Sequence, residues 1–397
     1  MKKKETDIKS RDIRIIRIYF LVLIGGMGAA NPFLNLYMSR QHFSGAEIGL
    51  VISIGSVIGL FAAPLWTRIH MESRYPIKML SVSLIMSGIA TVLFGYQTAF
   101  LGMAVFYCLR TLFNSGHFTT ADMLALRAID GTRVGYGSIR LWGSLGWSVV
   151  VLLTGWMNGK FSIRSGFFLY AAMNLIAVLV LTQLSPQNRS ASAPVNAGVS
   201  RYFSGIVDLF RNPALSGFGL MTIITAIGNL GVLNYETIYL DKLGASDSII
   251  GVACMVSAVV EVPMMLISDK MIRRFGPIKV IRTSLFVYSA VRLVVLLFPS
   301  VTTVILMRAL GGIAFSLLTI GQVVFMNMTL HSEKAGTALV IFTITIPTLI
   351  NILLTPLFGS IYDNLGAGWL YLISMSGYLL GALIYNRYYQ KHPVFKN

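Results

Sequence analysis

Tyr136-Gly-Ser-Ile-Arg-Leu-Trp-Gly-Ser-Leu-Gly-Trp147 opens an apolar run that continues to residue 158. On a helix, Arg140, Ser144 and Trp147 recur at i, i+4 and i+7 and therefore share one face. That face carries a cation, a hydroxyl and a large flat ring. Because the flanking sequence is long and apolar enough to span a bilayer, we expect a transmembrane helix, in which an ionisable side chain indicates function.

Apolar segments of this kind recur along the whole chain. Of the 397 residues, 55% are hydrophobic and only 12% are charged, which excludes a soluble globular protein. We count twelve runs of about 20 residues, the length that crosses a bilayer as a helix. They cover residues 15–39, 46–69, 78–97, 99–128, 136–158, 165–184, 214–241, 248–270, 278–299, 302–329, 335–361 and 367–386. The fold class that we predict is all-α integral membrane.

The formal net charge of +17 reflects membrane topology and not binding to nucleic acid. With the N-terminus inside, nearly all Lys and Arg residues outside the spans fall on the cytoplasmic side. The opposite side holds only Arg40, Lys160, Arg164 and Lys242. This asymmetry follows the positive-inside rule. We therefore expect a multi-pass protein of the cytoplasmic (inner) membrane with both termini in the cytoplasm.

The chain divides into two halves of six spans each. Residues 1–184 form a predicted N-terminal six-helix bundle, and residues 214–397 form a C-terminal one. Between them, residues 185–213 read as a cytoplasmic linker whose segment 202–210 has amphipathic helical spacing. Tyr75-Pro-Ile-Lys78 returns as Gly276-Pro-Ile-Lys279, 201 residues later. Two pseudo-symmetric bundles with a midplane binding site are an architecture of secondary transporters. The glycines near Gly28 and Gly146 indicate close helix packing.

Two polar groups are predicted inside the N-terminal bundle. Asp122 and Arg140 each lie nine residues from Gly131, so antiparallel helices place both about 13 Å from the connecting loop. Together with Trp147 they suit a hydroxyl-rich solute that stacks on a ring, although a structural ion pair is the alternative. Arg110 and His117 lie on another stripe, where Arg110 is expected to face the central cavity. His117 either relays protons or forms a hydrogen bond between helices.

The C-terminal bundle repeats the equal-depth pattern. Glu261 lies fifteen residues before Gly276 and Arg292 sixteen after it, so we expect them at one level about 23 Å from that loop. A buried carboxylate beside an arginine is a proton-binding site or a permanently ionised structural pair. Glu236 is expected to form an external gate with Arg308 or to serve as a second proton site.

The loop between the eighth and ninth spans carries a candidate gate. Asp269 precedes the basic pair Arg273 and Arg274, and these charges are able to form a clasp that opens and closes between conformations. Ordinary positive-inside charge is the alternative. The segment Ser268 to Lys279 resembles the inter-helix loop signature of the major facilitator superfamily.

The stretch from Tyr136 to Trp147 resembles the fifth-helix signature of the lactose permease, nucleoside and phenylpropionate proton-symporter branch of that superfamily. The resemblance implies solute binding by Asp122, Arg140 and Trp147. It also implies a place at the substrate–proton interface for Glu261 and proton coupling for Arg292. On the tenth helix, where the sugar permease carries a histidine and a glutamate, this chain has Gly311 and Ala314. Coupling through that pair is therefore excluded.

We accordingly expect a secondary active transporter, not an enzyme, that imports a sugar, nucleoside or aromatic acid with a proton by alternating access. The expected state is a monomer in the lipid bilayer, with no cofactor, no metal and no nucleic-acid partner. Two alternatives stay open. One is proton-antiport efflux of amphipathic compounds, and the other is a non-transporting membrane sensor that binds a solute.

Overall fold

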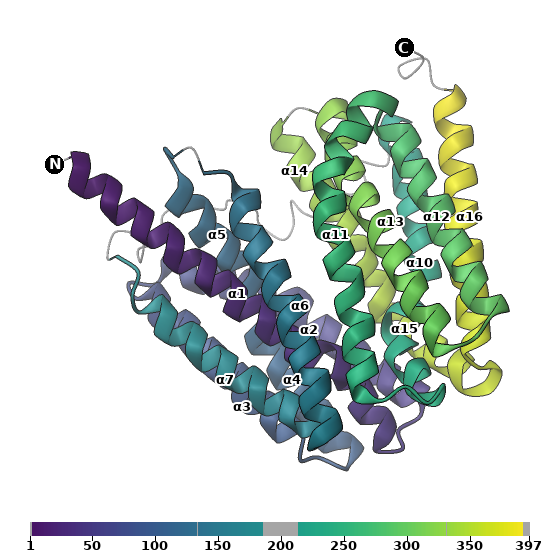
Figure 1. Ribbon diagram of the computed structural model, residues 1–397, viewed down its shortest axis with the longest axis horizontal. Coiled ribbons are helices and arrows are strands. Elements are labelled where there is room, and N and C mark those ends of the chain that lie inside the picture. The colour runs from purple at the N-terminus through teal and green to yellow at the C-terminus, as the bar shows by residue number, and fades with distance from the viewer. Residues whose placement is uncertain (1, 133, 186–212, 331, 392–397) are drawn as a thin grey trace. The chain divides into compact units, whose positions relative to one another are not determined.

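The computed structural model describes residues 2–132, 134–185, 213–330 and 332–391, which fold almost entirely as helices joined by short turns (Figure 1). The first seven helices are α1 (Lys2–Arg40), α2 (Gly45–Glu72), α3 (Pro76–Phe94), α4 (Phe100–Asn114), α5 (His117–Ile129), α6 (Tyr136–Lys160) and α7 (Arg164–Leu181). After the linker come α10 (Pro213–Lys242), α11 (Asp247–Phe275), α12 (Pro277–Leu297), α13 (Val301–Thr329), α14 (Ser332–Val340), α15 (Ile346–Leu365) and α16 (Ala367–Lys391).

Each predicted span corresponds to a helix or a pair of helices. Among the described residues, 11 helices are long and apolar enough to cross a membrane. The one predicted span that is not among these 11 is the fourth, over 99–128. It was predicted as one helix but consists of α4 and α5, which are separated at Ser115 and Gly116. The eleventh span is also irregular, because a π-helical turn at Ile341–Thr345 separates α14 from α15. Both interruptions are of the kind that recurs at functional sites in membrane helices.

The helices cluster into two compact units. Unit 1 gathers residues 1–43, 51–194 and 245–255, and unit 2 gathers residues 44–50, 195–244 and 256–397. The first turn of α2 therefore clusters with unit 2, and the first turns of α11 cluster with unit 1. The predicted linker, including its amphipathic segment 202–210, lies outside the described residues apart from its two ends.

In unit 1, α1 packs along α6 and α7 (Figure 1). Glycines on α6 make this close approach possible. A Cβ atom on Gly146 would lie 2.1 Å from the backbone oxygen of Leu21, and one on Gly143 would lie 2.3 Å from Cδ1 of Ile24. The close packing predicted for the glycine-rich stretch is confirmed at Gly146, where a side chain would collide with the α1 backbone, and at Gly143, where the end of the Ile24 side chain would have to move, but not at Gly137, where a Cβ atom would meet nothing within 4 Å.

In unit 2, α10 packs along α16, and α12 packs between α13 and α16. Gly228 and Gly377 bring the α10 and α16 backbones together, and Phe218 stacks on Phe325 with ring centroids 5.2 Å apart. The repeat seen in the sequence recurs here, since α3 begins at Pro76 and α12 begins at Pro277. Large apolar side chains cover the outside of the helices and suit contact with lipid chains; Leu101 and Leu353, each 74% exposed, are examples.

Candidate solute and proton sites

The Asp122 carboxylate, on α5, lies beside polar side chains from the start of α6. Its direct partner is Tyr136, whose hydroxyl donates to Oδ1 of Asp122 at 2.6 Å. The charge of Arg140 acts on both groups, and its guanidinium carbon lies 4.2 Å from the ring centre of Phe118. The predicted neighbourhood of Asp122 and Arg140 is therefore present, with a tyrosine as the link. Sequence analysis gave Tyr136 no role, although its place at the start of the quoted stretch was a signal that pointed to it.

Trp147 lies on the same helix, where it packs against α1. A Cβ atom on Gly28 would lie 3.5 Å from Cδ2 of the Trp147 ring and 3.1 Å from its backbone oxygen. The indole is half-buried, so part of its surface stays open to a ligand. The backbone oxygen of Ser144, one turn earlier, accepts a hydrogen bond from the Ser148 hydroxyl at 2.9 Å.

The second polar stripe is divided by the break between α4 and α5. Arg110 is 5% exposed, and its Nη2 donates to Oδ1 of Asn31 on α1. The guanidinium carbon of Arg110 also lies 5.4 Å from the ring centre of Tyr170 on α7. His117, at the start of α5, is fully buried and shares a hydrogen bond of 3.1 Å with the Ser83 hydroxyl. His117 therefore makes the interhelical bond that was its alternative role.

Helix α2 supports both sides of this break. Nε1 of Trp66 donates to the backbone oxygen of Leu112 at 2.6 Å and so satisfies a carbonyl at the end of α4. One turn further along α2, Nδ1 of His70 lies 2.7 Å from the Thr120 hydroxyl on α5. Sequence analysis missed Trp66 and His70, although the polar run Asn114 to His117, which contains a glycine, is a helix-ending signal.

Unit 2 contains a buried carboxylate with two arginines. Glu236, on α10, is 7% exposed. Nε of Arg308 donates to its Oε2 at 2.6 Å, and Nη1 of Arg292 donates to its Oε1 at 3.3 Å. The Tyr371 hydroxyl on α16 donates to Oε1 at 2.9 Å. Nη2 of Arg292 also donates to Oδ1 of Asn229 at 3.2 Å. The cluster joins α10, α12, α13 and α16 and carries a net positive charge.

The structure therefore gives Arg292 an acid partner other than the predicted one. Counting residues from a loop fixes depth but not direction around the helix axis, and Arg292 points toward Glu236. The Glu236–Arg308 pair is formed as expected. Glu261 is half-buried on α11, its backbone oxygen accepts from the Ser316 hydroxyl at 3.0 Å, and its charge reaches the Tyr288 hydroxyl together with that of Arg292.

The predicted gate residues lie on the surface near the end of α11. Asp269, Arg273 and Arg274 are all exposed, and Arg274 lies over the ring of its neighbour Phe275. Within the described residues, Asp269 and Arg273 make neither an ion pair nor a hydrogen bond through their side chains. Their gating role stays a prediction.

The tenth-span positions that depart from the sugar-permease pattern lie on α13. Ala314 is fully buried, whereas a Cβ atom at Gly311 would meet no atom within 4 Å. The open space at Gly311 would accept a larger side chain. Crowding by neighbouring atoms therefore does not explain why this position is a glycine.

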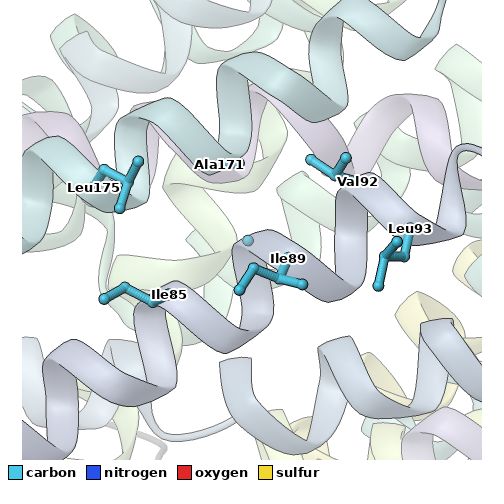
Figure 2. A pocket seen from close by; sticks show the side chains of 7 residues that line it. Ile85, Ile89, Val92, Leu93, Ala171 and Leu175 are labelled. Carbon is cyan, nitrogen blue, oxygen red and sulfur yellow. The ribbon is translucent and has the colours of Figure 1, made fainter.

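A groove of about 200 Å³ lies between α3 and α7, and none of the residues that line it is charged. Figure 2 shows its aliphatic lining, to which α3 contributes Ile85, Ile89, Val92 and Leu93 and α7 contributes Leu175. Such a lining offers no hydrogen bond to a polar solute, and its exposed leucines and isoleucines suit lipid chains. The groove is therefore not the solute site.

Several known proteins that resemble this chain are membrane transporters. An uncharacterized transporter, YwbF, of Bacillus subtilis (strain 168) is 27% identical over 276 residues, which are 69% of this chain and 67% of the relative. A maltose permease of Geobacillus stearothermophilus is 25% identical over 280 residues, or 70% of this chain and 69% of the permease. A solved structure of a mutant of the nucleoside transporter NupG has the same fold, with a TM-score of 0.82 and 16% identity over 95% of this chain and 99% of that one.

The model of the MFS_1 like family matches residues 13–373, nearly the whole chain. The helices, the buried charge clusters and the relatives all describe a multi-pass membrane protein that carries a small molecule. The chain belongs to the MFS_1 like family and is a secondary transporter of the major facilitator type.

Proposed function

We propose that this transporter imports a small organic solute together with a proton by alternating access. The observation that carries the proposal is the buried carboxylate of Glu236, held by two arginines and a tyrosine from three other helices. Charged groups at this depth are costly in a membrane and mark ion or solute pathways. The proposed setting is the cytoplasmic membrane, with both termini in the cytoplasm.

We assign solute binding to the cluster in unit 1. Asp122 and Tyr136 offer a carboxylate and a hydroxyl, Arg140 offers a fork of donors, and Trp147 offers a flat apolar surface. These groups suit a sugar, a nucleoside or an aromatic acid, because each of these solutes combines hydrogen-bonding groups with a face that stacks. The maltose permease among the relatives and the nucleoside transporter among the solved structures support the first two classes.

We assign proton coupling to the two carboxylates of unit 2, Glu236 and Glu261. Each carboxylate oxygen of Glu236 accepts a hydrogen bond from an arginine. A proton that binds to one of these oxygens therefore displaces the guanidinium group that donates to it. Proton binding is thereby linked to the positions of α12 and α13, which carry Arg292 and Arg308. Glu261 lies on α11 close to Pro263, where the missing backbone N–H permits the helix to bend.

Accumulation in proteoliposomes tests this proposal. Purified protein is reconstituted, an inward proton gradient is imposed, and uptake of labelled maltose, uridine and benzoate is followed. We expect one of them to accumulate, and we expect E261Q to abolish accumulation while leaving solute exchange intact. E72Q, at an exposed ion pair with Arg68, is the control and should behave as wild type. Solute loss under this gradient would indicate efflux, and no gradient-dependent flux of any of the three would overturn symport.

A further inference from the structure

Arg110 is a buried cation without an acidic partner. Its side chain belongs to α4 in unit 1 and is 5% exposed. Within the described residues, its side chain donates to the Asn31 amide oxygen and lies over the Tyr170 ring, and its charge also acts on Tyr107 and His117. None of these groups is a carboxylate, and the buried Nε of Arg110 has no hydrogen-bond acceptor among the described residues. A guanidinium is never deprotonated in proteins, so this positive charge persists.

Three other arginines within the spans lie near a carboxylate, whereas the partly buried Arg17 and Arg282 donate to the neutral side chains of Ser138 and Asn386. Arg140 lies beside the Asp122 carboxylate, and Arg292 and Arg308 share Glu236. Of these six arginines Arg110 is the most deeply buried, and in the part of the chain that the structure describes it has no carboxylate partner. An uncompensated ion in a low-dielectric interior is strongly unfavourable, and such ions are paired or bind a counter-ion. The buried guanidinium of Arg110 and the Asn31 amide beside it are therefore suited to bind an anion.

The site is open on the side of α1. Asn31 is exposed, so the pair that it forms with Arg110 is reached from the surface of unit 1. Pro32 follows Asn31 and cannot donate a backbone hydrogen bond to the Gly28 oxygen, which leaves the helix locally polar. Gly28 is also where Trp147 packs. Asn31 is three residues, about 4.5 Å along the helix axis, from that contact.

We propose that Arg110 and Asn31 bind the carboxylate of the transported solute, while Trp147 stacks on its ring or apolar face. This inference rests on the proposed transport function and narrows its solute to an organic carboxylate. The guanidinium fork matches a carboxylate with two parallel hydrogen bonds, one from Nε and one from an Nη group. When the solute carboxylate replaces the Asn31 amide oxygen as the acceptor for Arg110, the Asn31 amide nitrogen is available as a further donor to the solute.

Thermal unfolding of the purified full-length protein tests binding without any transport step. Sodium benzoate and sodium lactate are compared with benzamide and lactamide at constant chloride and ionic strength. We expect the carboxylates to raise the unfolding midpoint by about 2–4 °C at ten times their dissociation constant, and the amides to have little effect. R110Q should lose this shift. N31D places a built-in carboxylate beside Arg110, so it should raise the midpoint of the free protein and abolish the response to benzoate.

Arg282 supplies the matched control, because its Nη1 donates to Oδ1 of Asn386 in another arginine–asparagine pair. R282Q should keep the full response to benzoate. The inference is overturned if the amides act as strongly as the acids, if N31D still responds to benzoate, or if chloride alone gives the whole effect. The two proposals fail separately. If maltose or uridine accumulates with the proton gradient but carboxylates do not bind, the symport proposal holds and the carboxylate site is wrong. If carboxylates bind but no solute accumulates, the carboxylate site holds and the symport proposal is wrong.

Discussion

Replacing Glu236 with glutamine is expected to destabilise the protein strongly. The carboxylate accepts hydrogen bonds from Arg292, Arg308 and Tyr371, and it is 7% exposed. E236Q keeps the size of the side chain but removes the negative charge that Arg292 and Arg308, both partly buried, share. Removing one member of a buried charge cluster costs about 3–5 kcal/mol, most of it from the charges left behind.

A double-mutant cycle separates this electrostatic effect from a packing effect. If unpaired charge causes the loss, R308Q in the E236Q background should recover part of the stability, giving an interaction energy of about 1–3 kcal/mol. Unfolding in detergent is followed by tryptophan fluorescence against temperature and denaturant for the wild type, both single variants and the double variant. E72Q is the control, since its exposed ion pair with Arg68 is worth less than about 1 kcal/mol. Strictly additive losses for E236Q and R308Q would refute the reasoning.

Three further predictions follow from contacts in unit 1. Y136F removes the hydroxyl that donates to Asp122, and we expect weaker solute binding by about 1.5–3 kcal/mol in an equilibrium binding assay; unchanged affinity would remove Tyr136 from the site. G146A places a methyl group against the α1 backbone and should lower the unfolding midpoint, whereas G137A, with no atom within 4 Å, should leave it unchanged; equal midpoints would contradict the packing argument. D247N removes the charge and one of the two acceptor oxygens that Asp247 offers to Arg40 at the end of α1, at 2.6 and 3.1 Å, and should change the rate of solute exchange more than solute affinity; the reverse outcome would count against a conformational role for this pair.

Most of the helical organisation was predictable from the sequence. Apolar length alone locates the spans, since a bilayer demands about 20 residues per helix. The break between α4 and α5 was missed, because hydropathy averages over Ser115 and Gly116 and does not report the hydrogen bond from Trp66 that ends α4. The π-helical turn at Ile341–Thr345 leaves no pattern in composition for the same reason.

The candidate sites were predictable in their members but not in their pairings. Asp122 and Arg140 come from adjacent spans joined by a short loop, so equal residue counts were sufficient to bring them together. In unit 2 the same counting suggested Glu261 for Arg292, but the structure turns Arg292 toward Glu236, which lies on a helix two spans earlier. Tyr371 came from the last span, and nothing in the local sequence linked it to Glu236.

Simultaneous recording of solute and proton movement tests the central proposal most directly. Proteoliposomes in a weak buffer receive the solute that accumulates, and external pH is followed together with uptake. Proton symport predicts that external pH rises as the solute enters, with the two signals in fixed proportion, and that E261Q loses both together under net-uptake conditions. Solute entry without any rise in external pH would show that the transport is not coupled to protons.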